Sequence, residues 1–234
     1  MNLLSMNNSK KKRGKKMAYD YKKALSVEGK KCIVTGGAQG LSKGMAEALL
    51  ENGAAVVLMD VQKEKLEMVT NEYKAMGYEA YCVSGDLSKK EEIDRMFEEA
   101  MKLLGGRLDV LIPAAGIQRR YEPWEFPKEM WDLVINVNLN HVWFMCQKAI
   151  QVMKDQDTVG KIINIGSMSS FFGGTTVPAY TAAKGAVTQL SKSIASDCAD
   201  HNICCNVIAP GYMDTEMCAN MTQERKDECT ARIP

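Results

Sequence analysis

KCIVTGGAQGLSKGMAEALLENGAAVVLMD, residues 31–60, is the stretch that decides the fold. An apolar run at 31–35 ends in a glycine-rich turn, an amphipathic stretch follows at 44–52 and closes at Gly53, and a second apolar run ends at Asp60. Short apolar runs bounded by glycine indicate buried strands, and a glycine after a periodic stretch indicates the end of a helix. The segment therefore predicts a strand, a glycine turn, a helix and a second strand.

The same alternation continues along the rest of the chain. Helices are expected over 63–76, 90–104, 130–153 and 178–200, and strands over 79–84, 108–112, 161–165 and 203–208. Nearly continuous apolar strands separated by helices predict an α/β fold, a parallel sheet covered by helices on both faces. Right-handed crossovers give such a sheet the doubly wound, Rossmann-type arrangement. We expect one domain over 17–234, because the length suits one large core.

Composition and charge argue against several kinds of partner. A formal net charge of +1 gives no field that would draw the body of the chain to nucleic acid or to an acidic membrane. No apolar stretch approaches the roughly 20 residues that cross a bilayer. The eight cysteines form no CxxC pair, which indicates reduced thiols in a cytoplasmic protein. Cys204 and Cys205 lie in an expected strand, and we expect both to be buried.

The first sixteen residues differ from the rest, with six basic residues between Lys10 and Lys16. Residues 1–16 are a disordered tail, an arm that binds nucleic acid or membrane, or a mis-assigned start. We favour the last hypothesis, in which a ribosome-binding site has been translated and the native chain begins at Met17. Lys, Arg and Gly can all be encoded by purines alone.

The glycine turn and the end of the second strand carry a nucleotide-binding pattern. In TGGAQG, residues 35–40, backbone N–H groups and the helix dipole can face a pyrophosphate. Twenty residues later, Asp60 lies where a carboxylate can accept both hydroxyls of an adenosine ribose. That carboxylate would repel a 2′-phosphate, and Val61 and Gln62 offer no cation for it. We therefore predict NAD in preference to NADP, although the glycines alone also suit a structural turn.

Two later turns can also reach the nucleotide. Asp86 follows the third strand and could accept from an adenine amino group. Capping of the next helix is the alternative role for Asp86, although Ser88 is available as a cap. Gly116, after the fourth strand, would let the backbone pass close to a cofactor, and an ordinary turn glycine would look identical.

Tyr180 and Lys184 stand four residues apart in AYTAAK, and Ser167 lies thirteen residues before Tyr180. On a helix this spacing stacks the phenol and the ammonium group on one face, so the cation can stabilise a phenolate. A free phenol titrates near ~10, and a fixed cation brings its pKa toward working pH. A solvated pair is the alternative for this motif alone. Together with the glycine turn and the serine, it indicates a hydride-transfer enzyme.

In this order and spacing, the motifs resemble those of the short-chain dehydrogenase/reductase family from about Ser26 to the last residue. The matching features are TGxxxG at 35–40, the acidic end of the second strand, DL at 86–87, AAG at 114–116, VNL at 137–139, Ser167, YxxxK at 180–184 and PGxxxT at 210–215.

The resemblance implies a role for each matching residue. Tyr180 would exchange the hydroxyl proton, Ser167 would hydrogen-bond the reacting oxygen, and Lys184 would lower the tyrosine pKa and hold the nicotinamide ribose. Asn138 would anchor a water that links Lys184 to solvent, and Thr215 would bind the carboxamide. The implied NAD contacts are Gly36, Gly40, Leu41, Asp60, Asp86, Leu87, Ala115, Gly116, Tyr180, Lys184, Pro210, Gly211 and Thr215.

The chain departs from the family pattern at three places. Ser42 replaces the third glycine, and Pro113 and Ala114 replace both asparagines of the usual NNAG. The sequence ends at Pro234, where relatives continue through another helix, a seventh strand and a glycine-rich tail. We therefore expect the last helix and strand to be missing, one sheet edge to be open and this form to be less stable. A homotetramer or homodimer is expected for the full-length form.

Between the motifs, GIQRR at 116–120, SMSSFFGG at 167–174 and APGYMDT at 209–215 resemble the sugar-acid oxidoreductases of the family. Arg119 and Arg120 follow the fourth strand, and a planar guanidinium suits a sugar carboxylate, although a solvated loop pair is the alternative. Ser169, Gln118 and Trp124 could bind hydroxyls or simply line the cleft.

No metal site is expected, because the two histidines, His141 and His201, lack a ligand-spaced cluster. Two hypotheses follow for the whole chain. It is an NAD-dependent dehydrogenase that interconverts a secondary alcohol and a ketone on a sugar acid or polyol, or a truncated, catalytically idle NAD-binding or assembly module.

Overall fold

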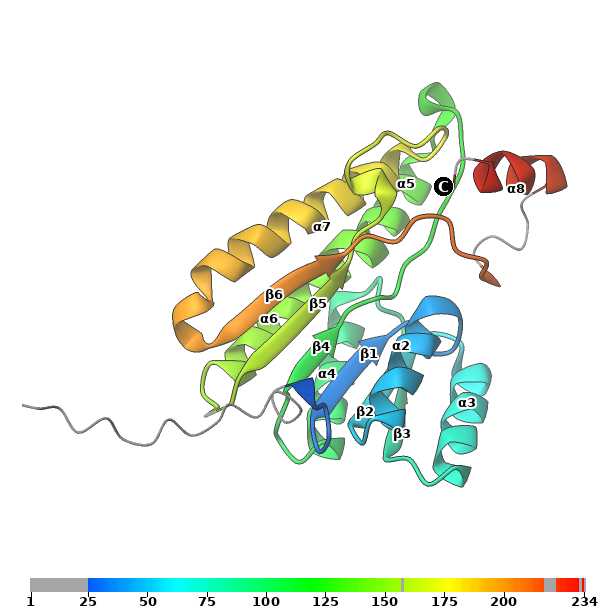
Figure 1. Ribbon diagram of the computed structural model, residues 1–234. Coiled ribbons are helices and arrows are strands. Elements are labelled where there is room, and N and C mark those ends of the chain that lie inside the picture. The colour runs from blue at the N-terminus through cyan, green and yellow to red at the C-terminus, as the bar shows by residue number, and fades with distance from the viewer. Residues whose placement is uncertain (1–24, 157, 217–221, 232, 234) are drawn as a thin grey trace, which may run out of the picture.

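A computed structural model describes residues 25–156, 158–216, 222–231 and 233 (Figure 1). The expectations for the tail at 1–16 and for a start at Met17 lie outside the described residues. The described chain forms a six-stranded sheet in the order β3-β2-β1-β4-β5-β6. The strands are β1 (Lys31–Thr35), β2 (Ala55–Asp60), β3 (Ala80–Ser84), β4 (Val110–Ile112), β5 (Gly160–Ile165) and β6 (Ile203–Ile208).

Every neighbouring pair of strands is parallel, which confirms the predicted doubly wound α/β fold. From β1 the chain builds outward to β3, and it then returns to place β4 on the other side of β1. A crevice opens beyond the carboxyl ends of the strands wherever the winding direction changes in this way. The crevice between β1 and β4 is therefore where a ligand site is expected.

Helices cover both faces of the sheet, as predicted. They are α2 (Gly40–Glu51), α3 (Lys63–Ala75), α4 (Lys90–Leu103), α5 (Lys128–Ile135), α6 (His141–Met153), α7 (Pro178–Asp197) and α8 (Gln223–Thr230). In β2, Val57 and Met59 pack with α4, α6 and α7, whereas Val56 and Leu58 pack with α2 and α3. Successive strand residues point to opposite faces, so this strand is apolar from Ala55 to Met59.

The edge strand β6 is buried on one face only. Cys205 lies in the core with α7, but Cys204 is exposed and Ile208 is 50% exposed. The expectation that both cysteines are buried was therefore wrong for Cys204, because neighbouring strand residues face opposite sides. At the other end of the sheet, α2 and α3 pack on one face of β1 and β2, as Figure 1 shows.

The predicted helix over 130–153 has an irregular centre. Between α5 and α6, a π-helical segment at Asn136–Asn140 makes the backbone N–H of His141 bond to the carbonyl of Asn136. A π turn inserts one extra residue and shifts the side chains that follow it. The shift lets His141 Nδ1 lie 3.0 Å from the carbonyl oxygen of Val137. The 3.6-residue periodicity could not predict this insertion.

No helix in the described part of the chain is both long and apolar enough to cross a bilayer.

Candidate active site

A cavity of about 710 Å³ lies at the carboxyl ends of the strands. Its volume is in the range of small-molecule and cofactor sites. Apart from Asn138 and Trp124, every residue considered from the sequence as a cofactor, substrate or catalytic residue lines it: Gly36, Gly40, Leu41, Asp60, Asp86, Leu87, Ala115, Gly116, Gln118, Arg119, Arg120, Ser167, Ser169, Tyr180, Lys184, Pro210, Gly211 and Thr215. The fold thus brings these segments together around one space.

Backbone conformation and close packing both require glycine in the glycine turn. Gly36 has φ +74°, and a Cβ placed on it would lie 2.9 Å from Cα of Ala115. Gly40 has φ +59° and is the first residue of α2, which begins earlier than the expected residue 44. Other residues are strained at such φ values. The turn therefore holds the start of α2, with its unpaired N–H groups, against the cavity.

Gly116 has a packing reason to be glycine in addition to the expected approach of its backbone to a cofactor. A Cβ there would lie 2.8 Å from Oδ1 of Asn138. The Asn138 side chain is fully buried, accepts from the backbone N–H of Ile117 at 3.2 Å and donates to the Ile117 and Val134 carbonyls. Both of its amide hydrogens are used in this way. The side-chain amide therefore ties α5 to the loop after β4.

Asp60 is held in place at the end of β2. Its Oδ2 accepts from the backbone N–H of Ala38 at 3.2 Å, and its Oδ1 accepts from that of Gln62 at 2.9 Å. The carboxylate thus joins the glycine turn to the start of α3 while it lines the cavity. Each oxygen keeps acceptor capacity for a further donor.

Asp86 lines the cavity too, and it organises its own turn. Its Oδ1 accepts from the backbone N–H and from the hydroxyl of Ser88, at 3.0 and 2.7 Å. The residue before α4 is Lys89, and no side chain caps that helix. Capping by Ser88 was therefore wrong, and the Asp86 side chain stabilises the turn that leads into α4.

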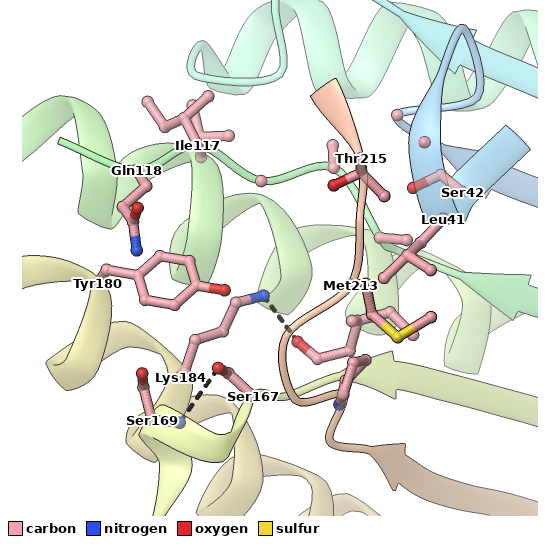
Figure 2. Close-up of a pocket in the computed structure, with 18 of the residues that line it drawn as sticks. Leu41, Ser42, Ile117, Gln118, Ser167, Ser169, Tyr180, Lys184, Met213 and Thr215 are labelled. Carbon is pink, nitrogen blue, oxygen red and sulfur yellow. Dashed lines mark hydrogen bonds between the residues drawn. The ribbon is translucent and has the colours of Figure 1, made fainter. Parts of the chain in front are cut away.

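Tyr180 and Lys184 lie one turn apart on α7, and Figure 2 shows both directed into the cavity. The Lys184 ammonium nitrogen is 5.6 Å from the centre of the Tyr180 ring. This ammonium group donates to the carbonyl of Ile165 at 2.7 Å, and Lys184 is only 4% exposed. Burial lowers the pKa of Lys184 to about 8. The amine therefore remains mostly protonated at neutral pH, as stabilisation of a phenolate requires.

Ser167 is oriented by the short helix that follows β5, a 3₁₀ turn at Met168–Ser170. Its hydroxyl oxygen accepts from the backbone N–H of Ser169 at 3.1 Å, and its own N–H donates to Ser170 Oγ. Ser170 in turn donates to the Lys184 carbonyl at 2.8 Å, which joins this turn to α7. The accepted hydrogen bond leaves the Ser167 hydroxyl hydrogen for a ligand in the cavity (Figure 2).

The two expected substrate arginines lie at the rim and are both exposed. Arg119 donates to the carbonyl of its neighbour Gln118 at 2.9 Å. Arg120 reaches across to the loop before α7, where it lies 3.3 Å from the carbonyl oxygen of Thr175. Gln118 lines the cavity, whereas Trp124 is not among its lining residues and is 78% exposed. The cleft-lining role considered for Trp124 is therefore not supported.

Several lining residues were not expected from the sequence, among them Gln39, Phe172, Met213 and Glu216. Gln39 and Met213 stand at variable positions inside TGxxxG and PGxxxT. Glu216 directly follows the second motif, and adjacency was its only signal.

Taken together, the lining fits a dinucleotide: a helix start for phosphates, a carboxylate for a ribose, and a tyrosine with a lysine at the other end. Among the described residues, no group of three or more histidine, cysteine or acidic side chains could hold a metal ion.

Comparison with known proteins identifies the family of this chain. The sequence pattern of the short chain dehydrogenases matches residues 30–226. The chain belongs to the short chain dehydrogenase family. It is therefore an oxidoreductase that acts on a CH–OH group, in a family that binds nicotinamide dinucleotides.

Similar members of the short chain dehydrogenase family act on sugar acids. The chain is 39% identical over 215 residues to the 2-dehydro-3-deoxy-D-gluconate 5-dehydrogenase of Escherichia coli (strain K12), which covers 90% of the chain and 83% of the relative. It is 37% identical over 200 residues to the 5-keto-D-gluconate 5-reductase of the same strain, with 86% and 78% covered.

A solved structure agrees with these relatives. The gluconate 5-dehydrogenase from Burkholderia cenocepacia, in complex with NADP and tartrate, superposes with a TM-score of 0.79 at 31% identity and covers 85% of the chain and 77% of that protein. The chain is thus related to gluconate 5-dehydrogenases in both sequence and fold.

Proposed function

We propose that the protein is an NAD-dependent dehydrogenase that interconverts a secondary alcohol and a ketone on a sugar acid or polyol, similar to 2-dehydro-3-deoxy-D-gluconate 5-dehydrogenase. The observation that carries this proposal is that Ser167, Tyr180 and Lys184 line the same cavity as the glycine turn. The alternative of an idle NAD-binding or assembly module is not favoured, because the proton-transfer groups are all present at that cavity.

In the direction of oxidation, Tyr180 as a phenolate accepts the proton of the substrate hydroxyl. Ser167 donates its hydroxyl hydrogen to the reacting oxygen and holds it beside Tyr180. When bound, the nicotinamide supplies the hydride chemistry by accepting the hydrogen and electron pair that leave the carbon. General acid–base catalysis of this kind contributes roughly 10²- to 10⁴-fold to the rate.

Lys184 stabilises the phenolate and, in this proposal, holds the nicotinamide ribose. Its ammonium group is already directed at the cavity and is bonded to a backbone carbonyl, not to a carboxylate. Among the described residues, no carboxylate pairs with Lys184 and cancels its effect on Tyr180. Asn138 positions the loop after β4 through its side chain and is not among the residues that line the cavity.

The preference for NAD rests on Asp60. A carboxylate at the end of β2, fixed by two backbone N–H groups, suits two ribose hydroxyls and repels a phosphate ester. The gluconate 5-dehydrogenase of Burkholderia cenocepacia contains NADP. Cofactor choice must therefore be measured for this chain.

The sugar-acid substrate is inferred from the rim and from the relatives. Arg119 and Arg120 offer planar guanidinium groups to a carboxylate, and Ser169 offers a hydroxyl for sugar hydroxyls. Tartrate, an organic acid, is bound in the related gluconate 5-dehydrogenase structure.

The test is a spectrophotometric assay at the reduced-nicotinamide band with NAD or NADP and a panel of gluconate, 5-keto-gluconate, 2-keto-3-deoxygluconate and neutral polyols. We expect turnover with NAD and a sugar acid, and none in the Tyr180→Phe variant. Tight NAD binding without turnover of any substrate would favour the idle module.

A further inference from the structure

The half of the cavity formed by β1, β2 and β3 is lined by acidic residues. Asp60 and Asp86 line it at the ends of β2 and β3, and Glu216, from the segment after β6, lies beside Gly40. The basic lining residues Arg119, Arg120 and Lys184 come from segments after β4. A dinucleotide carries negative phosphates, so an acidic half requires compensation by a cation or by backbone N–H groups. The N-terminus of α2 provides such N–H groups, and the structure places a lysine next to it.

That lysine is Lys65, in the first turn of α3. Its ammonium group donates to Oε1 of Gln39, the residue that precedes Gly40 in the glycine turn. The same ammonium group lies 3.7 Å from Oε1 of Glu216, on the segment after β6. Lys65 thus connects three parts of the chain that surround the phosphate end of the cavity.

Glu216 lies against the glycine turn itself. A Cβ placed on Gly40 would be 3.5 Å from Oε2 of Glu216 and 3.8 Å from Cβ of Thr215. A carboxylate there stands where the pyrophosphate would approach the start of α2. Binding must therefore move Glu216 or meet its repulsion. A phosphate at this place would compete with the Glu216 carboxylate for the Lys65 ammonium group.

We propose that Lys65 binds a phosphate of the dinucleotide and that Glu216 holds Lys65 in place in the free protein. This inference rests on the proposed function for the identity of the ligand. The phosphate is either the pyrophosphate, common to NAD and NADP, or the 2′-phosphate of NADP alone. In the second case, Lys65 would be the cation for the 2′-phosphate that neither Val61 nor Gln62 offers at the end of β2.

The exchange of partners requires little free energy. The Lys65 and Glu216 side chains are 36% and 51% exposed, and ion pairs of such exposure are weak. Gln39 is neutral and keeps the ammonium near the turn when the carboxylate leaves. The pyrophosphate as a whole and the 2′-phosphate each carry more negative charge than a single carboxylate, and either therefore competes effectively for the lysine.

The experiment measures dissociation constants of NADH and NADPH by fluorescence titration at one fixed salt concentration, without any substrate. The variants are Lys65→Met and Glu216→Gln. The matched control is Lys63→Met, because Lys63 lies in the same turn of α3, is 68% exposed and pairs only with Glu67 among the described residues.

We expect Lys65→Met to weaken binding about tenfold, the control to stay within about twofold, and Glu216→Gln to tighten binding about threefold. Weakening for NADPH alone assigns Lys65 to the 2′-phosphate, and weakening for both assigns it to the pyrophosphate. Unchanged binding of both in Lys65→Met, with measurable wild-type affinity, overturns the inference and leaves the proposed function intact. A wild type that binds neither dinucleotide overturns both.

Discussion

Asp109 and Lys184 are both buried charged residues, and they lie at opposite ends of the parallel sheet. Asp109 directly precedes β4 at the amino end and is 1% exposed, while Lys184 lies beside the carboxyl end and is 4% exposed. A buried charge is costly unless it is paired. The two residues meet this cost differently, and the difference separates the part of the molecule that stabilises the fold from the part that does chemistry.

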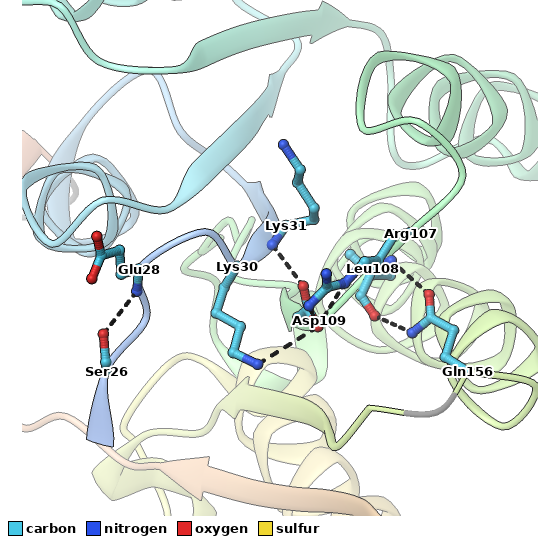
Figure 3. Close-up of polar contacts among 8 residues, drawn as sticks. All are labelled: Ser26, Glu28, Lys30, Lys31, Arg107, Leu108, Asp109 and Gln156. Carbon is cyan, nitrogen blue, oxygen red and sulfur yellow. Dashed lines mark hydrogen bonds and ion pairs between the residues drawn. The ribbon is translucent and has the colours of Figure 1, made fainter. Parts of the chain in front are cut away.

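At the amino end, Asp109 is surrounded by donors (Figure 3). It accepts from the backbone N–H of Lys31 at 2.9 Å and from the Arg107 guanidinium at 2.8 and 3.1 Å, and the Lys30 ammonium lies 3.8 Å away. Next to it, the Gln156 amide exchanges two hydrogen bonds with the backbone of Leu108. Each of these polar groups has its hydrogen-bond partners within the protein. The contact between Asp109 and Lys31 also joins the start of β4 to β1.

At the carboxyl end, Lys184 has no carboxylate within ion-pair distance in the described part of the chain. Its ammonium group has a backbone carbonyl and the face of a phenol ring as neighbours. The uncompensated positive charge can act on a developing negative charge in the cavity. A buried charge that is paired within the protein stabilises the fold, whereas a buried charge without an ion-pair partner remains available to a ligand.

The largest effect is expected on activity from Tyr180→Phe. Loss of the proton-transfer hydroxyl should reduce kcat by about 10²- to 10⁴-fold, because no other group would exchange the substrate proton. The melting temperature should remain within a few degrees of wild type. Steady-state kinetics and thermal denaturation measure the two quantities. The control is Tyr78→Phe, away from the cavity, and an equal loss there would contradict the assignment of the proton to Tyr180.

The matching change at the amino end is Asp109→Ala. It leaves Arg107 and the Lys31 N–H without their buried acceptor, so the free energy of unfolding should fall by about 3–5 kcal/mol. Urea denaturation measures the loss, with Asp132→Ala at an exposed ion pair as control, where less than about 1 kcal/mol is expected. NADH affinity of the folded variant should be unchanged. A stability close to wild type would remove the distinction between the two ends.

His141 extends the comparison to pH. It is fully buried in the neutral form, with Nδ1 donating to Val137 and Nε2 accepting from the Thr35 hydroxyl at 3.0 Å. Burial lowers its pKa from 6.5 to about 4. The unfolded chain therefore binds the proton first, and stability is lost as pH falls from about 6.5 toward 4.

The contribution of His141 to the free energy of unfolding should be about 2 kcal/mol smaller at pH 5 than at pH 7. The free energy of unfolding of His141→Gln should fall less over this interval by that amount, as urea denaturation at the two pH values would show. The control is His201→Gln, at an exposed position after α7, which should keep the wild-type slope. Parallel slopes for His141→Gln and wild type would contradict the depressed pKa.

The smallest effect on stability, and the one of opposite sign to Asp109→Ala, is expected for Lys184→Met. The variant removes a buried charge without a carboxylate partner, so the free energy of unfolding at pH 7 should rise by about 1 kcal/mol while turnover is lost. Lys192→Met, exposed on the same helix, is the control and should change stability by less than about 0.5 kcal/mol. Destabilisation by Lys184→Met would mean that the lysine serves the fold as Asp109 does.

The local features of this protein were predictable. The strands, the glycine turn and the Tyr180–Lys184 pair depend on neighbours within a few residues, so that alternation, turn chemistry and helical spacing indicate them directly. The order of the motifs then allowed residues such as Asp60 and Ser167 to be expected at one cavity. The π segment and the burial of a single cysteine in β6 were not predictable, because they depend on which face packs against a helix.

By itself the sequence determined the order of strands and helices, the glycine turn and the residues proposed for proton transfer. Only the tertiary structure decided that Lys65 lies between Gln39 and Glu216, that Asn138 is the reason for Gly116, and that Asp109 has a complete set of donors while Lys184 does not. The physical reason is that each of these contacts joins segments far apart in the chain. Their approach is fixed by the order in which the parallel strands assemble, which no local pattern records.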